Sequence, residues 1–456
     1  MLPTDVRIRD VQFSYEDFLY RTPIKFGGVV LDRVTLLNVT LTVETAAGLV
    51  ATGFGSMPLG NVWAYPSKAL KYDDTLLAMK QLAEKVATLY RDCPLAGHPI
   101  DITHTLEPEF FPVATKITKT SAEPMPTLAI LVAASPFDAA LHDAFGKVHQ
   151  RNCYHTYGSD MLRNDLGHYL GAEFKGERLD RYITREPVPS LPLYHLVGAL
   201  DPLTNAEVRV PLNDGLPETL GDWVVRDGLT HLKIKLNGDD LDWDVERVVR
   251  VDGVVDTAQR QRGVTTWFYS LDFNERCENV EYLTLFLTRL RQRTPTIYNR
   301  VQYIEQPTAR DLKANRHNTM HAAAKQKPVV IDESLVDLES LQLAREMGYT
   351  GVAFKACKGQ TQTLLLAAAA QKYGLFRCVQ DLTCPGASLI HSAGIAAHIP
   401  GVAAIEANSR QYCPAANAGW DAKFPGVFTI RNGVMNTAIL NGPGLGAVPV
   451  SKTKPI

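Results

Sequence analysis

The sequence predicts an α/β protein in which a small α+β domain precedes a closed barrel of parallel strands. Two observations carry this prediction. Residues 1 to about 135 contain alternating apolar strands and then a helical stretch, whereas short apolar runs alternate with amphipathic stretches from about residue 190 onward. Alternation of strands and helices is typical of parallel βαβ units, and eight strands at roughly 30 residues per unit suffice for a closed barrel.

The first domain is predicted to contain three strands followed by a long helix. Apolar and polar residues alternate over 6–15, 34–45 and 48–57, with turn residues between these stretches. Apolar residues at helical spacing follow over 74–90. Strands followed by a helix favour a separate α+β unit.

The second domain is predicted from eight apolar runs with helical stretches between them. An open doubly wound sheet is the alternative, but no early strand is followed by a glycine-rich loop of the dinucleotide-binding type. The glycine-rich stretches 53–58 and 442–447 do not lie between a strand and a helix with a later acidic partner, so we expect loops or turns there. The predicted barrel strands lie within 191–199, 231–236, 265–274, 301–307, 327–334, 350–359, 375–383 and 402–409, and helices are predicted within 242–255, 279–293, 336–348 and 362–374.

Composition limits the class of function. The net charge of −2 without a basic tract argues against a nucleic-acid partner, and no apolar run reaches the roughly 18 residues of a membrane span. The N-terminus lacks the layout of a signal peptide. Seven dispersed cysteines without a C-x-x-C pair argue for a reducing compartment and against a disulfide framework. We therefore expect a soluble cytoplasmic enzyme.

Three consecutive predicted barrel strands end in carboxylates: Asp272, Glu305 and Asp332, with Asn274 and Glu333 close behind. A single aspartate at a strand end is usually a cap or turn residue, but the carboxyl ends of barrel strands share one rim, where catalytic groups collect. Three carboxylates converging there need a cation between them. Oxygen ligands select a hard ion, so we expect Mg²⁺, with Mn²⁺ as the alternative, and the absence of His and Cys at these strand ends disfavours zinc.

Lysines flank these acidic strands. Lys233 and Lys235 are two residues apart on the preceding strand and therefore share a face. Lys355 lies on the next strand after the acidic three, among apolar neighbours, and the second and sixth strands of an eight-strand barrel lie opposite each other. The alternative for Lys233 and Lys235 is an exposed strand face, and we expect Lys358 to be a surface residue.

This arrangement suits proton abstraction next to a carboxylate. A cation bound to the substrate carboxylate acidifies the α-proton by stabilising the enediolate that forms. A lysine can take that proton when nearby cations and desolvation lower its pKa. Lys235 is the expected proton carrier, and Lys233 is its electrostatic neighbour and a substrate contact. Two opposed bases, Lys235 and Lys355, give racemisation or epimerisation, whereas one base gives cycloisomerisation or syn-elimination.

The ordered set "KIK", "LDFN", "IEQP", "IDES" and "FKACKG" resembles the enolase superfamily, within it the mandelate racemase and muconate lactonizing enzyme subgroup. The resemblance implies a modified TIM barrel of the (β/α)7β type with an N-terminal α+β capping domain, to which the C-terminal segment returns. The implied domains are 1–135, 136–410 and 411–456, with a longer cap segment near 90–130. It also implies a homo-oligomer, and it gives the three carboxylates to the metal and the three lysines to catalysis.

The resemblance places two cap loops over the substrate, at 21–28 and 53–66. Their side chains Lys25, Trp63 and Tyr65 are candidate substrate contacts. The substrate itself is expected to be a small carboxylate.

Residues at the ends of the seventh and eighth barrel strands help to distinguish the reactions of this family. Members that dehydrate acid sugars often carry a histidine on strand seven, which is absent here, so a syn-dehydratase or lyase of an acid sugar or related hydroxy acid is the alternative. Dipeptide epimerases carry Asp-x-Asp after strand eight, where this chain has Glu406 and Asn408. Asp381 is either a turn residue or a pocket residue. A non-catalytic protein that retains the fold is disfavoured, because all six site residues are present.

Overall fold

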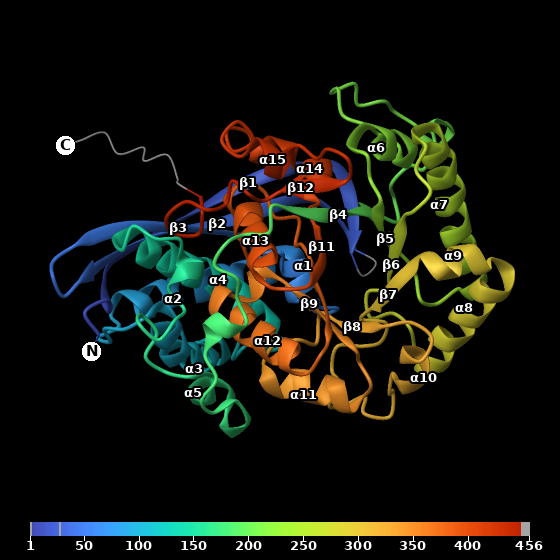
Figure 1. Ribbon diagram of the computed structural model, residues 1–456. Coiled ribbons are helices and arrows are strands. Elements are labelled where there is room, and N and C mark those ends of the chain that lie inside the picture. The colour runs from blue at the N-terminus through green and yellow to red at the C-terminus, as the bar shows by residue number, and fades with distance from the viewer. Residues whose placement is uncertain (1, 27–28, 448–456) are drawn as a thin grey trace.

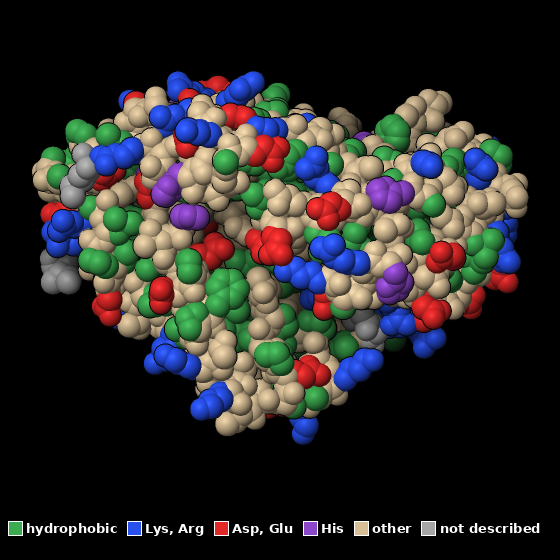
Figure 2. Space-filling view, turned by 90° about the horizontal axis from the view of Figure 1, so that it is seen from below, with side chains coloured by type: hydrophobic (Ala, Val, Ile, Leu, Met, Phe, Trp, Pro, Cys, Tyr) green, Lys and Arg blue, Asp and Glu red, His purple; other side chains and the backbone are tan. Residues whose placement is uncertain are grey.

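The computed structural model describes residues 2–26 and 29–447 of the chain. Figure 1 shows a capping unit with its antiparallel sheet and helices α2 and α3 on the left and the helices α7 and α8 of a barrel on the right. The predicted α/β class, with an N-terminal cap and a closed parallel barrel, is confirmed. On the face shown in Figure 2, acidic and basic side chains are interspersed over the surface.

The cap is built on a three-stranded antiparallel sheet in the order β1-β2-β3. Alternate residues of β2, including Val39, Leu41 and Val43, are fully buried, because a strand with one covered face needs an apolar side chain at every second position. The long helix α4 contacts β2 and β3 on that face. The cap elements are β1 (Val6–Phe26), β2 (Val29–Thr45), β3 (Val50–Pro58), α1 (Asn61–Ala64), α2 (Tyr72–Arg91), α3 (Pro99–Ile117) and α4 (Thr127–Val148).

Two predicted cap loops are wrong in part, because the sheet extends further than the turn residues indicate. Residues 53–58 continue β3, and a Cβ atom added at Gly55 would lie 1.9 Å from the carbonyl oxygen of Pro136 on α4. These glycines therefore allow the strand to approach the helix backbone closely. In the 21–28 stretch, Arg21–Phe26 belong to β1, and residues 27–28 lie outside the described part.

Among the described residues, one helix, α4, is long and apolar enough to cross a membrane. Its most apolar part is completely buried inside the protein. It packs against the sheet and against α2 and α3 in the core of the cap. The predicted domain boundary at 135/136 falls inside this helix, and the division into domains stays a prediction.

The barrel is a closed ring of eight parallel strands in the order β4 to β11, and β11 pairs with β4 to complete it. All eight predicted strands are confirmed. The sequence could identify them because parallel strands are buried on both faces and therefore appear as short apolar runs. The strands are β4 (Ser190–Val197), β5 (His231–Lys235), β6 (Phe268–Asp272), β7 (Val301–Glu305), β8 (Val329–Ile331), β9 (Gly351–Phe354), β10 (Phe376–Val379) and β11 (Val402–Glu406).

A helix follows each of the first seven barrel strands, although α10 after β7 has only four residues, and the last strand is followed by the four-residue helix α14. Asp240 and Asn279 cap the N-termini of α7 and α8 by accepting hydrogen bonds from backbone N–H groups. The helical elements are α6 (Leu220–Asp227), α7 (Leu241–Arg262), α8 (Val280–Arg293), α9 (Pro295–Arg300), α10 (His321–Ala324), α11 (Leu338–Glu346), α12 (Gln360–Lys372) and α13 (Ala387–His398), with the 3₁₀ turns η4 (Asn205–Glu207) and η5 (Ala356–Lys358).

The segment after the barrel returns to the cap. Strand β12 pairs antiparallel with β4, and the backbone N–H of Leu445 donates to Asp143 on α4 over 2.8 Å. Asn152, just after α4, donates to the carbonyl of Leu440. The remaining elements are η1 (Cys153–His155), α5 (Leu166–Leu170), η2 (Ala172–Phe174), η3 (Leu179–Arg181), α14 (Ser409–Tyr412), η6 (Pro414–Asn417), α15 (Pro425–Phe428) and β12 (Val434–Asn436).

Candidate active site

The two lysines of β5 point into the barrel. Lys233 is 2% exposed and Lys235 is 6% exposed, so the alternative of an exposed strand face is wrong. Lys233 Nζ donates to Glu305 Oε1 over 2.6 Å and to Glu406 Oε2 over 3.1 Å. Lys235 Nζ donates to Asp272 Oδ2 over 2.5 Å. Residues two apart on a strand share a face, and here that face lines the carboxyl end of the barrel.

Strand register brings the three acidic strand ends together. Lys235 is the register partner of Asp272 on the next strand, and Asp272 is the partner of Glu305 on the strand after that. Glu305 is the partner of Val330, so Asp332 stands two residues further along β8 and beyond its end. All three carboxylates are 1% exposed. The sequence prediction that they share one rim agrees with this geometry.

On the opposite side, Lys355 and Lys358 both contact Asp332. Lys355 Nζ lies 2.9 Å from Asp332 Oδ2, and Lys358 Nζ donates to the carbonyl of Asp332 over 2.6 Å and to its Oδ1 over 3.1 Å. Lys358 is 2% exposed, so our expectation of a surface residue is wrong. The indole of Trp63 on α1 covers this pair, with Lys355 Nζ 4.1 Å from the ring centroid.

Four ammonium groups thus face the buried acids of the barrel. Burial alone would lower the pKa of Lys233, but Glu305, Glu406 and Asp272 outweigh it and raise the pKa well above its usual value. Burial likewise lowers the pKa of Lys355, and Asp332 raises it further than burial lowers it.

The pKa values of two of the buried carboxylic acids are shifted in the opposite direction, below their usual values. Burial acts to raise the pKa of Asp332, but Lys355 and Lys358 lower it to about 2. Asp272 behaves similarly: burial opposes ionisation, and the charges of Lys235 and Lys233 hold its pKa below the usual value. Both carboxylates are therefore ionised at neutral pH.

The donor set fits a hard divalent cation. Three buried carboxylates on adjacent strand ends provide oxygen ligands, and Glu305 Oε2 is buried without a hydrogen-bond partner among the described residues. As the side chains stand, no three His, Cys, Asp or Glu residues within 2–26 and 29–447 are arranged to hold a metal ion. Lys233 Nζ contacts Asp272 and Glu305 together, so a cation would have to displace this ammonium group.

The cap residues lie at different distances from this centre. Lys25 lines a cavity of about 150 Å³ together with Lys235 and Asn274, and we call this space beside Lys235 the mouth cavity. Trp63 Nε1 donates to Glu333 Oε1 over 2.9 Å. Tyr65 instead donates its hydroxyl to the carbonyl of Glu123 inside the cap. The roles of all these residues as substrate contacts stay predictions.

Glu333 is a buried acid beneath the cap. Burial, and then the charge of Asp332, raise its pKa to about 7. Its Oε2 atom has no hydrogen-bond partner within the described ranges. Glu333 can therefore hold or release a proton near neutral pH at the edge of the site.

The ends of strands seven and eight are joined by hydrogen bonds. Asp381 accepts from the backbone N–H groups of Leu382, Cys384 and Asn408, which is the behaviour of a turn residue, and burial raises its pKa to about 6. Glu406 accepts from Asn408 Nδ2 over 2.6 Å.

Gln380, which the sequence reasoning missed, accepts a hydrogen bond from Lys233 over 2.7 Å. The sequence feature that could have identified Gln380 is its position directly after β10, level with the functional residues at the other strand ends.

The fold and these strand ends define a capped (β/α)7β-barrel protein with a lysine and carboxylate centre at the carboxyl rim. Residues 216–452 match the family model described as "Enolase C-terminal domain-like". This match covers more than half of the chain. The protein therefore belongs to the enolase superfamily, with the mandelate racemase and muconate lactonizing enzyme group as its subgroup, and is an enzyme of that superfamily.

Solved structures of this superfamily share the fold at low sequence identity. A dipeptide epimerase from Enterococcus faecalis V583, complexed with Mg and the dipeptide L-Leu-L-Tyr, is 16% identical with a TM-score of 0.63, over 96% of this chain and 99% of that chain. The L-Ala-D/L-Glu epimerase from Bacillus subtilis is 15% identical with a TM-score of 0.63, over 96% and 98%. A muconate lactonizing enzyme from Pseudomonas fluorescens, complexed with muconolactone, is 17% identical with a TM-score of 0.60, over 96% of each. No curated protein sequence matches the chain significantly.

Proposed function

We propose that the protein removes the proton α to a substrate carboxylate, with Mg²⁺ held by Asp272, Glu305 and Asp332. The observation that carries this proposal is the position of Lys235 and Lys355. Lys235 ends the second strand of a closed ring of eight, Lys355 directly follows the sixth, and the acidic strand ends lie between them. What a bound Mg²⁺ ion would supply is positive charge, which acidifies the α C–H and lowers the pKa of the neighbouring ammonium groups.

The two lysines divide the proton transfers between the faces of the substrate. Lys235 lines the mouth cavity and takes the proton from the α carbon on one face. Lys355 returns a proton on the other face, which inverts the centre and gives racemisation or epimerisation. Lys233, which keeps Gln380 and Glu406 as partners when a cation displaces it from Asp272 and Glu305, is placed to bind a substrate carboxylate oxygen. Trp63 covers Lys355 and excludes water from it.

Cycloisomerisation needs the same abstraction with one lysine as base and the other as an electrostatic partner. Syn-dehydration of an acid sugar or related hydroxy acid is the second candidate reaction. The end of strand β10 favours racemisation, epimerisation or cycloisomerisation, because it carries Gln380 and no histidine that could act as an acid.

The surroundings of the reaction follow from the same proposal. The substrate is a small carboxylate, the protein acts in the cytoplasm, and it assembles as a homo-oligomer. All seven cysteines are free and buried, which supports a reducing compartment.

The metal is tested by thermal unfolding with Mg²⁺ against EDTA. A ligand that binds the folded state at 100 times its Kd adds about 2.7 kcal/mol of stability. Mg²⁺ should raise the Tm, EDTA should reverse the rise, and Asp332→Asn should reduce it. Equal Tm values for the wild type in Mg²⁺ and in EDTA would contradict the metal site.

The mechanism is tested by deuterium exchange at the α carbon in D₂O, with N-acyl amino acids, dipeptides and acid sugars as substrates. Lys235→Ala should abolish exchange of one enantiomer or epimer, and Lys355→Ala should abolish exchange of the other. Identical deuterium incorporation by wild type and Lys355→Ala would exclude Lys355 as an acid or base. Lys325→Ala, a lysine outside the barrel rim, serves as the matched control.

A further inference from the structure

The two proposed bases, Lys235 and Lys355, are held in place by different parts of the fold. Lys235 is the last residue of β5 and the register partner of Asp272 on the neighbouring barrel strand. Lys355 instead follows the last residue of β9 and leads into the turn η5, which ends at Lys358. The position of Lys355 therefore depends on what fixes this turn and the helix α12 that begins after it.

Helix α12 begins at a glycine and is capped by a residue of the cap. Its N-cap residue is Gly359, with a φ of 101°, and a glycine has no side chain that could accept from the first N–H groups of the helix. Asp138 on α4 supplies this acceptor. Its Oδ2 accepts from the backbone N–H of Thr361 over 2.7 Å, and its Oδ1 accepts from the Thr361 hydroxyl over 2.8 Å. A carboxylate at this place also stabilises the positive end of the helix.

Asp138 is buried and oriented by two helices of the cap. Thr103 of α3 donates its hydroxyl to Oδ1 over 2.9 Å. His142, one turn further along α4, has its Nε2 atom 3.4 Å from the same oxygen and 3.0 Å from the Thr361 hydroxyl. Burial would raise the pKa of Asp138, but its interactions with His142 and Thr361 lower the pKa below the usual value. The capping group is therefore an ionised carboxylate in a fixed orientation.

The first turn of α12 is tied to the backbone of Lys355. The hydroxyl of Thr363 donates to the carbonyl of Lys355 over 3.1 Å, and the N–H of Lys358 donates to the same carbonyl over 3.0 Å. A Cβ atom added at Gly359 would lie 3.3 Å from Asp138 Oδ2, so the turn passes directly against the capping carboxylate. A shift of the start of α12 would therefore move the backbone that carries Lys355.

The cap also reaches the side chain of Lys355. Trp63 on α1 places its ring 4.1 Å from Lys355 Nζ. Strand β3 leads into α1 and packs against α4, so Trp63 and Asp138 belong to one packed unit. Lys355 thus has an indole of the cap over its ammonium group and a carboxylate of the cap beside its turn.

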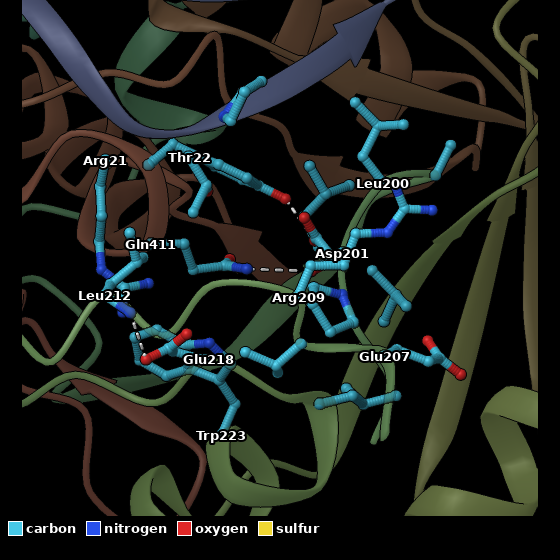
Figure 3. Close-up of a pocket in the computed structure, with 18 of the residues that line it drawn as sticks. Arg21, Thr22, Leu200, Asp201, Glu207, Arg209, Leu212, Glu218, Trp223 and Gln411 are labelled. Atoms are coloured by element: carbon cyan, nitrogen blue, oxygen red, sulfur yellow. Dashed lines mark hydrogen bonds between the residues drawn. The ribbon is translucent and has the colours of Figure 1, made fainter. Parts of the chain in front are cut away.

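Another contact between cap and barrel lies at the hairpin formed by β1 and β2, which we call the cap hairpin. Arg21 of β1 forms an ion pair with Asp214 in the loop between β4 and α6, in which Nη2 donates to Oδ1 over 2.9 Å. Figure 3 shows Arg21 reaching from the cap strand toward Leu212 of the same loop. This loop contains none of the lysines and carboxylates of the proposed centre. Asp138 differs, because the helix that it caps begins directly after the turn of a proposed base.

We propose that Asp138 is a positioning residue for Lys355, through which the cap sets the geometry of one of the two proton transfers and leaves the other to the barrel. The proposal rests on the proposed function, since it takes Lys355 as an acid and base of the reaction. Loss of the capping carboxylate should disturb the transfer by Lys355 and spare the transfer by Lys235. A merely structural role in the cap would weaken both transfers alike.

The first measurement is the rate of α-deuterium exchange in D₂O for each of two epimers, with the full chain loaded with Mg²⁺. Asp138→Ala should slow exchange of the epimer that depends on Lys355 about 100-fold, the cost of a misplacement of about 1 Å, and should spare the other epimer. Asp138→Asn keeps an acceptor for the Thr361 N–H and should retain most of the rate. Thr363→Val removes the bond to the Lys355 carbonyl without touching the cap, and it should give a smaller loss on the same side.

Asp143→Ala is the matched control. Asp143 is a buried carboxylate of the same helix, but it accepts from the backbone N–H groups of Phe54 in β3 and Leu445 in the C-terminal segment, each over 2.8 Å. Its loss should lower the Tm and change exchange of the two epimers by the same factor. The positioning role is overturned if Asp138→Ala slows both epimers equally, if it slows neither, or if Asp143→Ala gives the same one-sided loss.

A second measurement does not depend on turnover. Reductive methylation of the full chain in EDTA, followed by mass spectrometry of its peptides, gives the labelling rate of Lys355 relative to Lys235. Asp138→Ala should raise this ratio about ten-fold, the effect of losing one hydrogen bond to a charged group, whereas Asp143→Ala should leave the ratio unchanged. An unchanged ratio in Asp138→Ala overturns the positioning role. If the ratio rises but the wild type exchanges none of the probes, the proposed reaction alone is refuted.

Discussion

Replacing Lys358 by methionine tests whether this lysine, which the sequence predicted at the surface, holds the acidic centre together. Methionine keeps the length of the side chain and its apolar packing but removes the ammonium group. In the structure that group donates to the carbonyl of Asp332 over 2.6 Å and to its carboxylate over 3.1 Å. The change therefore removes two charge-assisted hydrogen bonds from one buried residue.

The expected cost follows from what Asp332 keeps. Its carboxylate retains Lys355 at 2.9 Å, so it does not become the unpaired buried charge that costs about 3–5 kcal/mol. Its carbonyl retains the N–H of Leu335 at 2.9 Å. The loss of hydrogen bonds to a charged donor, about 1.5–3 kcal/mol each, is offset in part by the desolvation that methionine avoids. We expect the free energy of unfolding to fall by about 2 kcal/mol.

The assay is urea unfolding at neutral pH in EDTA, followed by circular dichroism. Lys313→Met is the matched control, because the pair of Lys313 with Glu339 is 65% and 69% exposed and solvent screens it, so its loss should change stability little. If both variants lose the same small amount, then Lys358 does not stabilise the acidic centre and the reasoning fails.

Three further predictions concern other parts of the molecule. His391 is buried, and neither of its ring nitrogens has a hydrogen-bond partner within the described ranges. Burial lowers the pKa of its imidazole to about 3, so its contribution to stability is lost as pH falls below 6.5. The free energy of unfolding should therefore drop by about 2 kcal/mol from pH 7 to pH 5, and His391→Leu should lack this part of the drop in urea titrations. Gly55→Ala should cost about 3 kcal/mol, because its Cβ atom meets the backbone of Pro136; a loss below about 0.5 kcal/mol would show that the strand can move away. Trp63→Phe removes the hydrogen bond to Glu333 and should cost about 1–2 kcal/mol in thermal unfolding, whereas an unchanged Tm would show that this bond contributes nothing.

The barrel and its charged rim could be predicted because their sequence signals are local. Lys233 and Lys235 share a face as a consequence of strand geometry alone, and each acidic residue ends an apolar run. Lys358 needed a further signal: it follows Lys355 by three residues in the 3₁₀ turn η5, where side chains three apart stand above one another.

The remaining features depend on contacts between distant segments. Residues 53–58 carry glycines that suggest a loop, but the glycines serve the close approach of β3 to α4. The loop between β4 and α6 has no periodic pattern, and its position against the cap hairpin is set by the pairing of Asp214 with Arg21, 193 residues earlier. Such a contact leaves no trace in the local sequence.

The return of the C-terminal segment to the cap sets the order in which the chain can finish folding during synthesis. The N–H of Leu445 donates to Asp143 on α4, a contact that spans 302 residues. The cap leaves the ribosome first, and domains generally begin to fold from the N-terminus. Its central helix nevertheless stays incompletely covered until the whole barrel has emerged. During translation part of this apolar helix therefore stays exposed until the C-terminal segment has emerged, and exposed apolar surface of this kind favours aggregation of the incomplete chain.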